Sequence, residues 1–229
     1  EDQMQKVIQL SRGRGVDGIL LIGNTDPDPR VEYLKELSFP FVLIGRAEGV
    51  HMVYIDNIGG AHRAVSYLLR LGHRKIGCIS GTPEMLGGKD RLQGYLDAMG
   101  QAGLKVQDSW IREGRFTEDG GYRAAKELMA TERFSAIFSV GDVMALGAIR
   151  ALNEVGYRIP EDVALVSFDD FYMASHVNPP LTTVHQDTFS LGRMAASLLL
   201  DELKEPKDRP VQIVLPTELI IRQSCGVMQ

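Results

Sequence analysis

The sequence predicts an α/β fold built from parallel sheets with helices on both faces. Three observations lead to this fold class. Short apolar runs alternate with segments of helical period along most of the chain. The connections between them are short and rich in Gly, Pro and Asp. The runs are continuously apolar, which is typical of parallel strands that are buried on both faces.

Seven apolar runs are the predicted strands. The first, Gly18–Ile22, closes at Gly23 and is expected to be buried on both faces. The second, Phe41–Ile44, follows Pro40. The remaining five are Ile76–Ser80, Ala136–Val140, Val163–Phe168, Thr182–His185 and Val211–Leu215.

Helical periodicity places four helices between and after these strands. Asn57 and Asp142 stand where N-cap residues belong, and capping alone would explain Asp142. Gly72 and Gly156 follow as stop signals. The predicted helices are 57–71, 92 to about 103, 142 to about 155, and 187 or 188 to about 203.

Composition excludes several functional classes. The 229 residues are 44% hydrophobic and 24% charged, which is ordinary globular usage, and the summed charge of −5 shows no basic footprint for nucleic acid. We find no apolar stretch near the ~20 residues of a membrane-spanning helix, and the opening Glu1-Asp2-Gln3 does not resemble a signal peptide. Cys78 and Cys225 are expected to be free thiols in a reducing cytoplasm, with a disulfide as the alternative.

Motifs for catalysis and metal binding are weak. Lys89 in Gly87-Gly88-Lys89 is followed by Asp90, where a phosphate-binding loop needs Ser or Thr. The five histidines lack zinc spacing, so we expect neither metal nor cofactor. Asp169 and Asp170 are the best catalytic pair, but adjacent residues do not easily flank one glycosidic bond. A strand-end carboxylate that binds a ligand hydroxyl fits better.

Nine segments, in order, resemble the lactose-repressor/galactose-repressor (LacI/GalR) family of transcription regulators. Together they extend from about residue 16 to the C-terminus. They are Val16–Leu20, Asp56–Ala61, Leu71–Ile76, Arg91–Tyr95, Gly141–Ala148, Ile159–Val163, Ser167–Asp170, Pro179–Val184 and Leu215–Leu219.

The resemblance implies a periplasmic-binding-protein-like core. Such a core has two doubly wound subdomains joined by three crossovers, and the effector binds in the cleft between them. The crossovers are expected near Ile55–Asp56, Gln186–Asp187 and Leu215–Pro216. The two subdomains are then 1–55 plus 187–215, and 56–186 plus 216–229. The first is expected to be incomplete, because the family places further strands, a hinge helix and a helix-turn-helix before Glu1.

The resemblance also places ligand contacts on six residues. Arg91 and Asp169 are expected to bind ligand hydroxyls or carbonyls, and Phe116 to stack on a ring. The alternatives are a solvated Arg91 paired with Asp90 or Glu84, a helix-capping Asp169 and an ordinary core Phe116. Gln186 contacts ligand or holds the hinge, Arg46 lines the cleft or forms a surface ion pair, and Asp142 is also a candidate ligand contact.

Two departures from the family pattern concern these contacts. Gly141 stands where members commonly have Asn, and Gly45 where many have Asp. Two missing polar contacts leave room for a bulkier or less polar effector.

The function implied is that of an effector-binding core, not an enzyme. We expect a homodimer in the cytoplasm whose operator DNA is bound by an N-terminal domain outside this chain, without membrane association. A sugar is the favoured effector, and a purine is the alternative for a purine-responsive repressor. A transporter-associated sugar-binding protein, secreted and monomeric, is the first rival. A hydrolase acting through Asp169 and Asp170 is the second.

Overall fold

The chain forms two compact units in a computed structural model that describes residues 3–13, 15–23 and 25–226. Unit 1 comprises the described residues of Glu1–Ile55, Glu84–Gly87 and Asp187–Leu215. Unit 2 comprises those of Asp56–Pro83, Gly88–Gln186 and Pro216–Gln229. The short segment Glu84–Gly87 was expected in the second subdomain. It packs with unit 1 because Met85 pairs with Thr25 in a β-bridge. The expectation about a signal peptide rests partly on Glu1 and Asp2, which lie outside the described residues.

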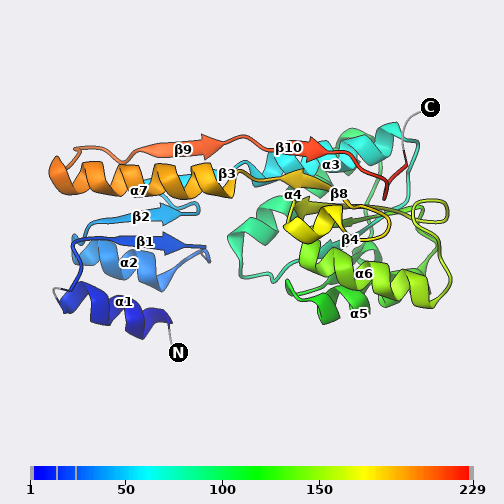
Figure 1. Cartoon of the computed structure of the whole chain (residues 1–229), viewed down its shortest axis with the longest axis horizontal. Helices are drawn as coiled ribbons and strands as arrows, with labels where there is room; N and C mark the ends of the chain where they lie inside the picture. Colours follow the sequence, from blue (N-terminus) through cyan, green and yellow to red (C-terminus); the bar gives the residue numbers. More distant parts are fainter. Residues whose placement is uncertain (1–2, 14, 24, 227–229) are drawn as a thin grey trace. The chain divides into compact units, whose positions relative to one another are not determined.

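Unit 1 contains a four-stranded parallel sheet of order β1-β2-β3-β9. Its helix α7 runs along this sheet, as Figure 1 shows in orange, and buries Ala195, Leu198 and Leu199. The elements of unit 1 are α1 (Gln3–Arg12), β1 (Ile19–Ile22), α2 (Pro29–Glu36), β2 (Phe41–Ile44), β3 (Met52–Ile55), α7 (Thr188–Lys204) and β9 (Gln212–Leu215).

One prediction about β1 is wrong. Ile19 and Leu21 are buried against a cluster that includes Val7 of α1 and Leu34 of α2. The alternate side chains of β1 point to the opposite face, where Leu20 is 36% and Ile22 is 70% exposed. Helix α7 packs mainly over β2 and β3, so this strand is covered fully on one face and poorly on the other.

Unit 2 contains a six-stranded sheet of order β10-β8-β7-β6-β4-β5. All pairs are parallel except β10 with β8, so one edge departs from the purely parallel sheet that was predicted. The elements of unit 2 are α3 (Asn57–Arg70), β4 (Ile76–Ser80), α4 (Leu86–Gln101, from Gly88 on), β5 (Ile111–Glu113), α5 (Glu118–Thr131), β6 (Ala136–Ser139), α6 (Asp142–Glu154), β7 (Ala164–Asp169), β8 (Thr182–His185) and β10 (Glu218–Ile220), with 3-10 turns at Asp108–Trp110 and Tyr172–Ser175.

Helices cover both faces of the unit 2 sheet. On one face Tyr95 of α4 stacks on Phe138 of β6. On the other, α5 and α6 lie side by side, as Figure 1 shows in green. Their backbones approach so closely that a Cβ on Gly147 would lie 1.9 Å from the carbonyl oxygen of Glu118. The predicted fold class, parallel sheets with helices on both faces, is therefore confirmed.

Two predicted helix caps are wrong. The N-cap of α3 is Asp56, whose carboxylate accepts a hydrogen bond from the backbone N–H of Gly59 at 2.9 Å, and Asn57 is the first helical residue. The N-cap of α6 is Gly141, and the Asp142 carboxylate makes no capping bond. Both Asx residues are one position inside the helix, where the side chain is directed elsewhere.

The structure adds three strands that the sequence did not predict, namely β3, β5 and β10. Helix α4 also begins earlier than predicted, at Leu86. Both cysteines are free and buried, which confirms the prediction of two free thiols.

Candidate functional site

Polar groups gather at the carboxyl ends of the unit 2 strands. Asp169 is the last residue of β7, Gln186 follows β8, and Val140 and Gly141 follow β6. Helix α4 contributes Arg91 to the same edge of the sheet. In open α/β sheets this edge is where ligands bind.

Arg91 is the centre of this group. It is only 8% exposed, and its guanidinium lies over the ring of Phe168 at 3.9 Å from the ring centroid. Nε donates to Oδ1 of Asn57 at 2.8 Å. Nη1 donates to the carbonyl of Val140 and to Oδ1 of Asp169, both at 2.7 Å. The alternative of a solvated Arg91 is therefore wrong.

The second terminal nitrogen of Arg91 is available. Nη2 has no hydrogen-bond partner among residues 3–13, 15–23 and 25–226. The ring contact and the three hydrogen bonds fix the plane of the guanidinium, so Nη2 is a preoriented donor. Such a donor suits a ligand hydroxyl or carbonyl.

Asp169 is held by two donors and an unusual backbone. Oδ1 accepts from Arg91 and from Nε2 of Gln186 at 2.6 Å, so Gln186 positions the carboxylate. The residue has φ 119°, a conformation that side chains rarely adopt and that is often found at functional sites. Burial raises the pKa of the Asp169 carboxyl, and the Arg91 charge opposes this effect. The Asp169 carboxylate accepts from these two side chains, so these contacts do not support the alternative that Asp169 is a helix cap.

Phe116 lies beside this carboxylate on a strained backbone. Arg115 and Phe116 have φ 55° and 54°, two consecutive non-glycine residues in the left-handed region. The half-buried ring packs on Gly81, where a Cβ would lie 2.2 Å from it. A Cβ on Gly141 would meet both the Phe116 ring at 3.3 Å and Oδ2 of Asp169 at 3.4 Å. Ring and carboxylate thus border one small space.

Asp142 has a structural role that differs from the predicted cap. It is 2% exposed, and its Oδ2 accepts from the backbone N–H of Phe171 at 2.8 Å. Oδ1 accepts from the hydroxyl of Thr183 at 2.7 Å. Burial raises the pKa of the Asp142 carboxyl to about 6, and these two hydrogen bonds oppose the shift. Asp142 therefore joins α6 to β8 and to the segment after β7.

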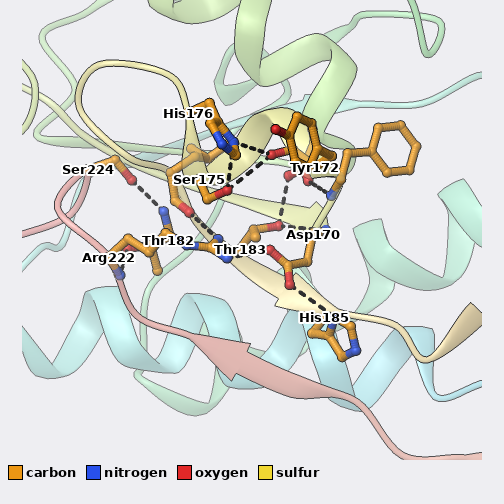
Figure 2. A network of polar contacts seen from close by, with 12 residues as sticks. Asp170, Tyr172, Ser175, His176, Thr182, Thr183, His185, Arg222 and Ser224 are labelled. Carbon is orange, nitrogen blue, oxygen red and sulfur yellow. Dashed lines mark hydrogen bonds and ion pairs between the residues drawn. The ribbon is translucent and has the colours of Figure 1, made fainter.

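Asp170 belongs to a different network from Asp169. Its Oδ2 contacts Nδ1 of His185 at 2.9 Å, and its Oδ1 accepts from Nη2 of Arg222 at 2.7 Å. Figure 2 shows the Asp170 carboxylate directed toward His185, with Thr183 close to it. The two adjacent carboxylates thus bind different partners and do not face one another across a common space.

Sequence and structure both match known proteins. The profile of the periplasmic-binding-protein-like domain matches residues 65–225. The transcriptional regulator CelR of Thermobifida fusca is 41% identical over 93% of this chain, and the repressor PurR of Escherichia coli is 35% identical over 97%. This chain spans 64% of CelR and 67% of PurR.

Two solved structures agree with these matches. A complex of CelR with cellobiose has a TM-score of 0.91 and 40% identity, and the match covers 96% of this chain and 69% of the chain in that structure. A LacI-family regulatory protein from Chloroflexus aggregans has a TM-score of 0.89 and 35% identity, covering 98% and 82%.

The chain belongs to the LacI family. It is the periplasmic-binding-protein-like core of such a regulator, and its relatives are named as regulators rather than enzymes. The family resemblance read from nine sequence segments is thereby confirmed.

Five of the six predicted contact residues of this LacI-family core lie in unit 2: Arg91, Asp169, Gln186, Phe116 and Asp142. The sixth, Arg46, is exposed and lies in unit 1 after β2, so its role stays a prediction. Within the described ranges no helix is long and apolar enough to cross a membrane. The same residues contain no group of three His, Cys, Asp or Glu side chains arranged to hold a metal ion.

Sequence reasoning missed two residues that shape the site. Asn57 orients Arg91, although the position of Asn57 suggested a helix cap. The ring of Phe168 packs against one face of the guanidinium. The segment Asp56–Ala61 was part of the family resemblance, but only the tertiary contact reveals what Asn57 binds.

Proposed function

We propose that this core binds a saccharide at the group formed by Arg91, Asp169 and Phe116. The single observation that carries the proposal is the buried Arg91–Asp169 pair with a preoriented Nη2 donor. A carboxylate and a guanidinium bind the hydroxyls of a sugar ring, and the Phe116 ring offers an apolar plate for its C–H face. The solved complex of CelR with cellobiose supports the same ligand class.

A purine is the alternative effector, because a base also stacks on an aromatic ring and accepts from arginine. PurR supports it at 35% identity, against 41% for CelR. A transport-associated binding protein would share this fold, but the regulators among the relatives favour regulation. The contacts do not favour a hydrolase that uses Asp169 and Asp170 as a catalytic pair, because the two carboxylates bind separate partners.

We further propose that the whole protein is a cytoplasmic homodimer that binds operator DNA through a domain outside this chain. The saccharide acts by binding two conformations of the core with different affinities, since a ligand shifts a conformational equilibrium only through such a difference. The net charge of −5 agrees with DNA contacts that lie outside this chain.

Thermal unfolding against mono- and disaccharides, nucleobases and nucleosides tests the ligand. A saccharide at 100 times its Kd adds about 2.7 kcal/mol, which raises the Tm of a chain of this size by roughly 5–10 °C. The shift should vanish in Arg91→Ala and persist in Arg158→Ala, because Arg158 is a surface residue with a 71% exposed side chain. A purine shift would establish the alternative, and absence of any saccharide shift would refute the proposal.

An exposed apolar group in unit 2 supports the homodimer. Phe171 and Met173 are each 50% exposed and Tyr172 is 78% exposed, in the segment after β7. Exposed apolar groups of this kind often mark protein interfaces. Tyr172→Asp should convert a dimer to a monomer in sedimentation, with Tyr157→Asp as a comparison. A monomeric wild-type regulator would contradict the homodimer proposal.

A further inference from the structure

Two of the places where the chain passes from unit 1 to unit 2 start from neighbouring strands. Strands β3 and β9 are parallel, and their last residues, Ile55 and Leu215, are paired in register. The chain leaves unit 1 after each of these residues and enters unit 2 at Asp56 and at Pro216. The two passages therefore begin at one common point of the unit 1 sheet.

Arg63 of α3 joins the two passages inside unit 2. Its Nη2 donates to the carbonyl oxygen of Thr217 at 3.1 Å and also to the Thr217 hydroxyl. Its Nη1 approaches Oδ2 of Asp56 at 3.4 Å, and these two side chains are 45% and 36% exposed. An ion pair this exposed adds little to the stability of a fold. The main consequence of the Arg63 contacts is therefore where they hold Thr217.

Thr217 is connected to the ligand-binding Arg91 by direct packing. A Cβ on Gly60, in the first turn of α3, would lie 2.7 Å from the Thr217 hydroxyl oxygen and 2.8 Å from the Phe168 ring. The centroid of this ring lies 3.9 Å from the Arg91 guanidinium. The same helical turn carries Asn57, whose Oδ1 accepts from Nε of Arg91. A displacement of Thr217 relative to α3 would therefore move the groups that orient the guanidinium.

We propose that Arg63 is a positioning residue for Arg91. By holding Thr217 against the first turn of α3, Arg63 keeps that turn and the Phe168 ring in place, and with them the direction of the Arg91 Nη2 donor. Thr217 directly follows Pro216, where the chain enters unit 2. The same contact thus joins the saccharide site to the backbone that links the units. This inference rests on the proposed saccharide site.

Titration calorimetry with cellobiose and with glucose tests the inference, and thermal unfolding confirms that each variant is folded. Arg63→Met keeps a long side chain without donors, so it should weaken binding of the sugar that the wild type binds by about 3–10-fold. Arg63→Lys should recover most of this loss. A single nitrogen makes both bonds to Thr217, and an ammonium group can replace it with its three donors.

The matched control is Asp56→Ala. It removes the carboxylate partner of Arg63 and leaves both bonds to Thr217 in place. Its affinity should stay within about twofold of the wild type, because the contact with Asp56 is long and exposed.

A double-mutant cycle separates positioning from a general loss of stability. Asn57→Ala removes the acceptor through which the first turn of α3 holds Nε of Arg91. In that background Arg63→Met should weaken binding by less than about twofold, because one contact through which it acts is already gone. A purely structural role of Arg63 would give the same fold-loss in both backgrounds.

Unchanged affinity in Arg63→Met, or equal fold-losses in the two backgrounds, would overturn the inference and leave the saccharide site standing. A loss in Asp56→Ala as large as that in Arg63→Met would also overturn it, because the carboxylate and not Thr217 would then be the partner that counts. A wild type that binds neither sugar would overturn both the inference and the proposed function.

Discussion

Arg91 and Asp169, which are 78 residues apart in the sequence, form an ion pair of 2.7 Å at the carboxyl edge of the unit 2 sheet. Their side chains are 10% and 12% exposed. Removing one member of a pair this buried leaves the other charge poorly solvated. The pair therefore contributes to folding as well as to binding, and variants must be interpreted with both effects in view.

The first prediction concerns the coupling of this pair. Arg91→Met and Asp169→Asn should each lower the free energy of unfolding by about 3 kcal/mol, because each leaves a buried group without its partner. The double variant should lose clearly less than the sum of the two. Urea unfolding of the four proteins measures the coupling. Additive losses would show that the ion pair does not couple the two residues.

The second prediction separates two neighbouring residues at the start of α3. Asp56→Ala removes the cap on the N–H of Gly59 and should destabilise the protein by about 1 kcal/mol, with saccharide affinity within about twofold of wild type. Asn57→Ala removes the acceptor for Nε of Arg91. It should weaken saccharide binding more than Asp56→Ala does, and it should lower the Tm less than Asp56→Ala does.

Thermal unfolding and calorimetry on both variants test this contrast. If Asn57→Ala lowered the Tm by as much as Asp56→Ala and left affinity unchanged, the role of Asn57 in orienting Arg91 would be wrong.

The short runs picked out in the sequence predicted most of the strands, because burial on both faces leaves a clear signature. Runs such as Ile76–Ser80 and Thr182–His185 became β4 and β8 with the predicted bounds. One missed strand, β3 (Met52–Ile55), is as long as β8. The other two, β5 and β10, have three residues each and lie at sheet edges. Their residues, Ile111–Glu113 and Glu218–Ile220, contain charged side chains that mask the pattern.

The site was predictable as a set of residues but not as a set of contacts. Arg91 and Asp169 were chosen from the family pattern, and the structure brings them together. The functions of Asn57 and Asp142 depend on partners 34 and 41 residues away, Arg91 and Thr183 respectively. A local rule that reads Asx at a helix start as a cap cannot anticipate such partners.

The third prediction concerns the close approach of α5 and α6. Gly147→Ala would place a Cβ 1.9 Å from the carbonyl oxygen of Glu118, and this backbone atom cannot move without shifting the helix. The variant should lose at least about 1–3 kcal/mol of unfolding free energy.

The matched control is Gly100→Ala in α4, which meets nothing within 4 Å. This variant should be neutral or gain up to about 1 kcal/mol, because Ala is the better helix former. Urea unfolding compares the two, and similar stabilities would contradict the tight packing of α5 on α6.

The last prediction follows from the buried Asp142 carboxyl, whose pKa is raised from 3.8 to about 6 by burial. Between these values the folded protein binds more protons than the unfolded chain, so the contribution of Asp142 to stability falls as the pH rises. It is complete below about pH 4 and is lost as the pH passes about 6. A shift of about two pKa units corresponds to about 3 kcal/mol.

Asp142→Asn removes this titration, because the amide resembles the protonated acid. The unfolding free energy of the wild type minus that of Asp142→Asn should therefore fall by up to about 3 kcal/mol between pH 4 and pH 7. Asp162→Asn is the control: the Arg158 hydrogen bond lowers the pKa of Asp162 to about 2, so its contribution is lost only below about pH 4. Urea unfolding across this pH range should show that the wild-type-minus-variant difference in unfolding free energy falls for Asp142→Asn. The same difference should stay constant for Asp162→Asn. A flat difference for Asp142 as well would mean that its carboxyl is ionised throughout and that burial does not raise its pKa.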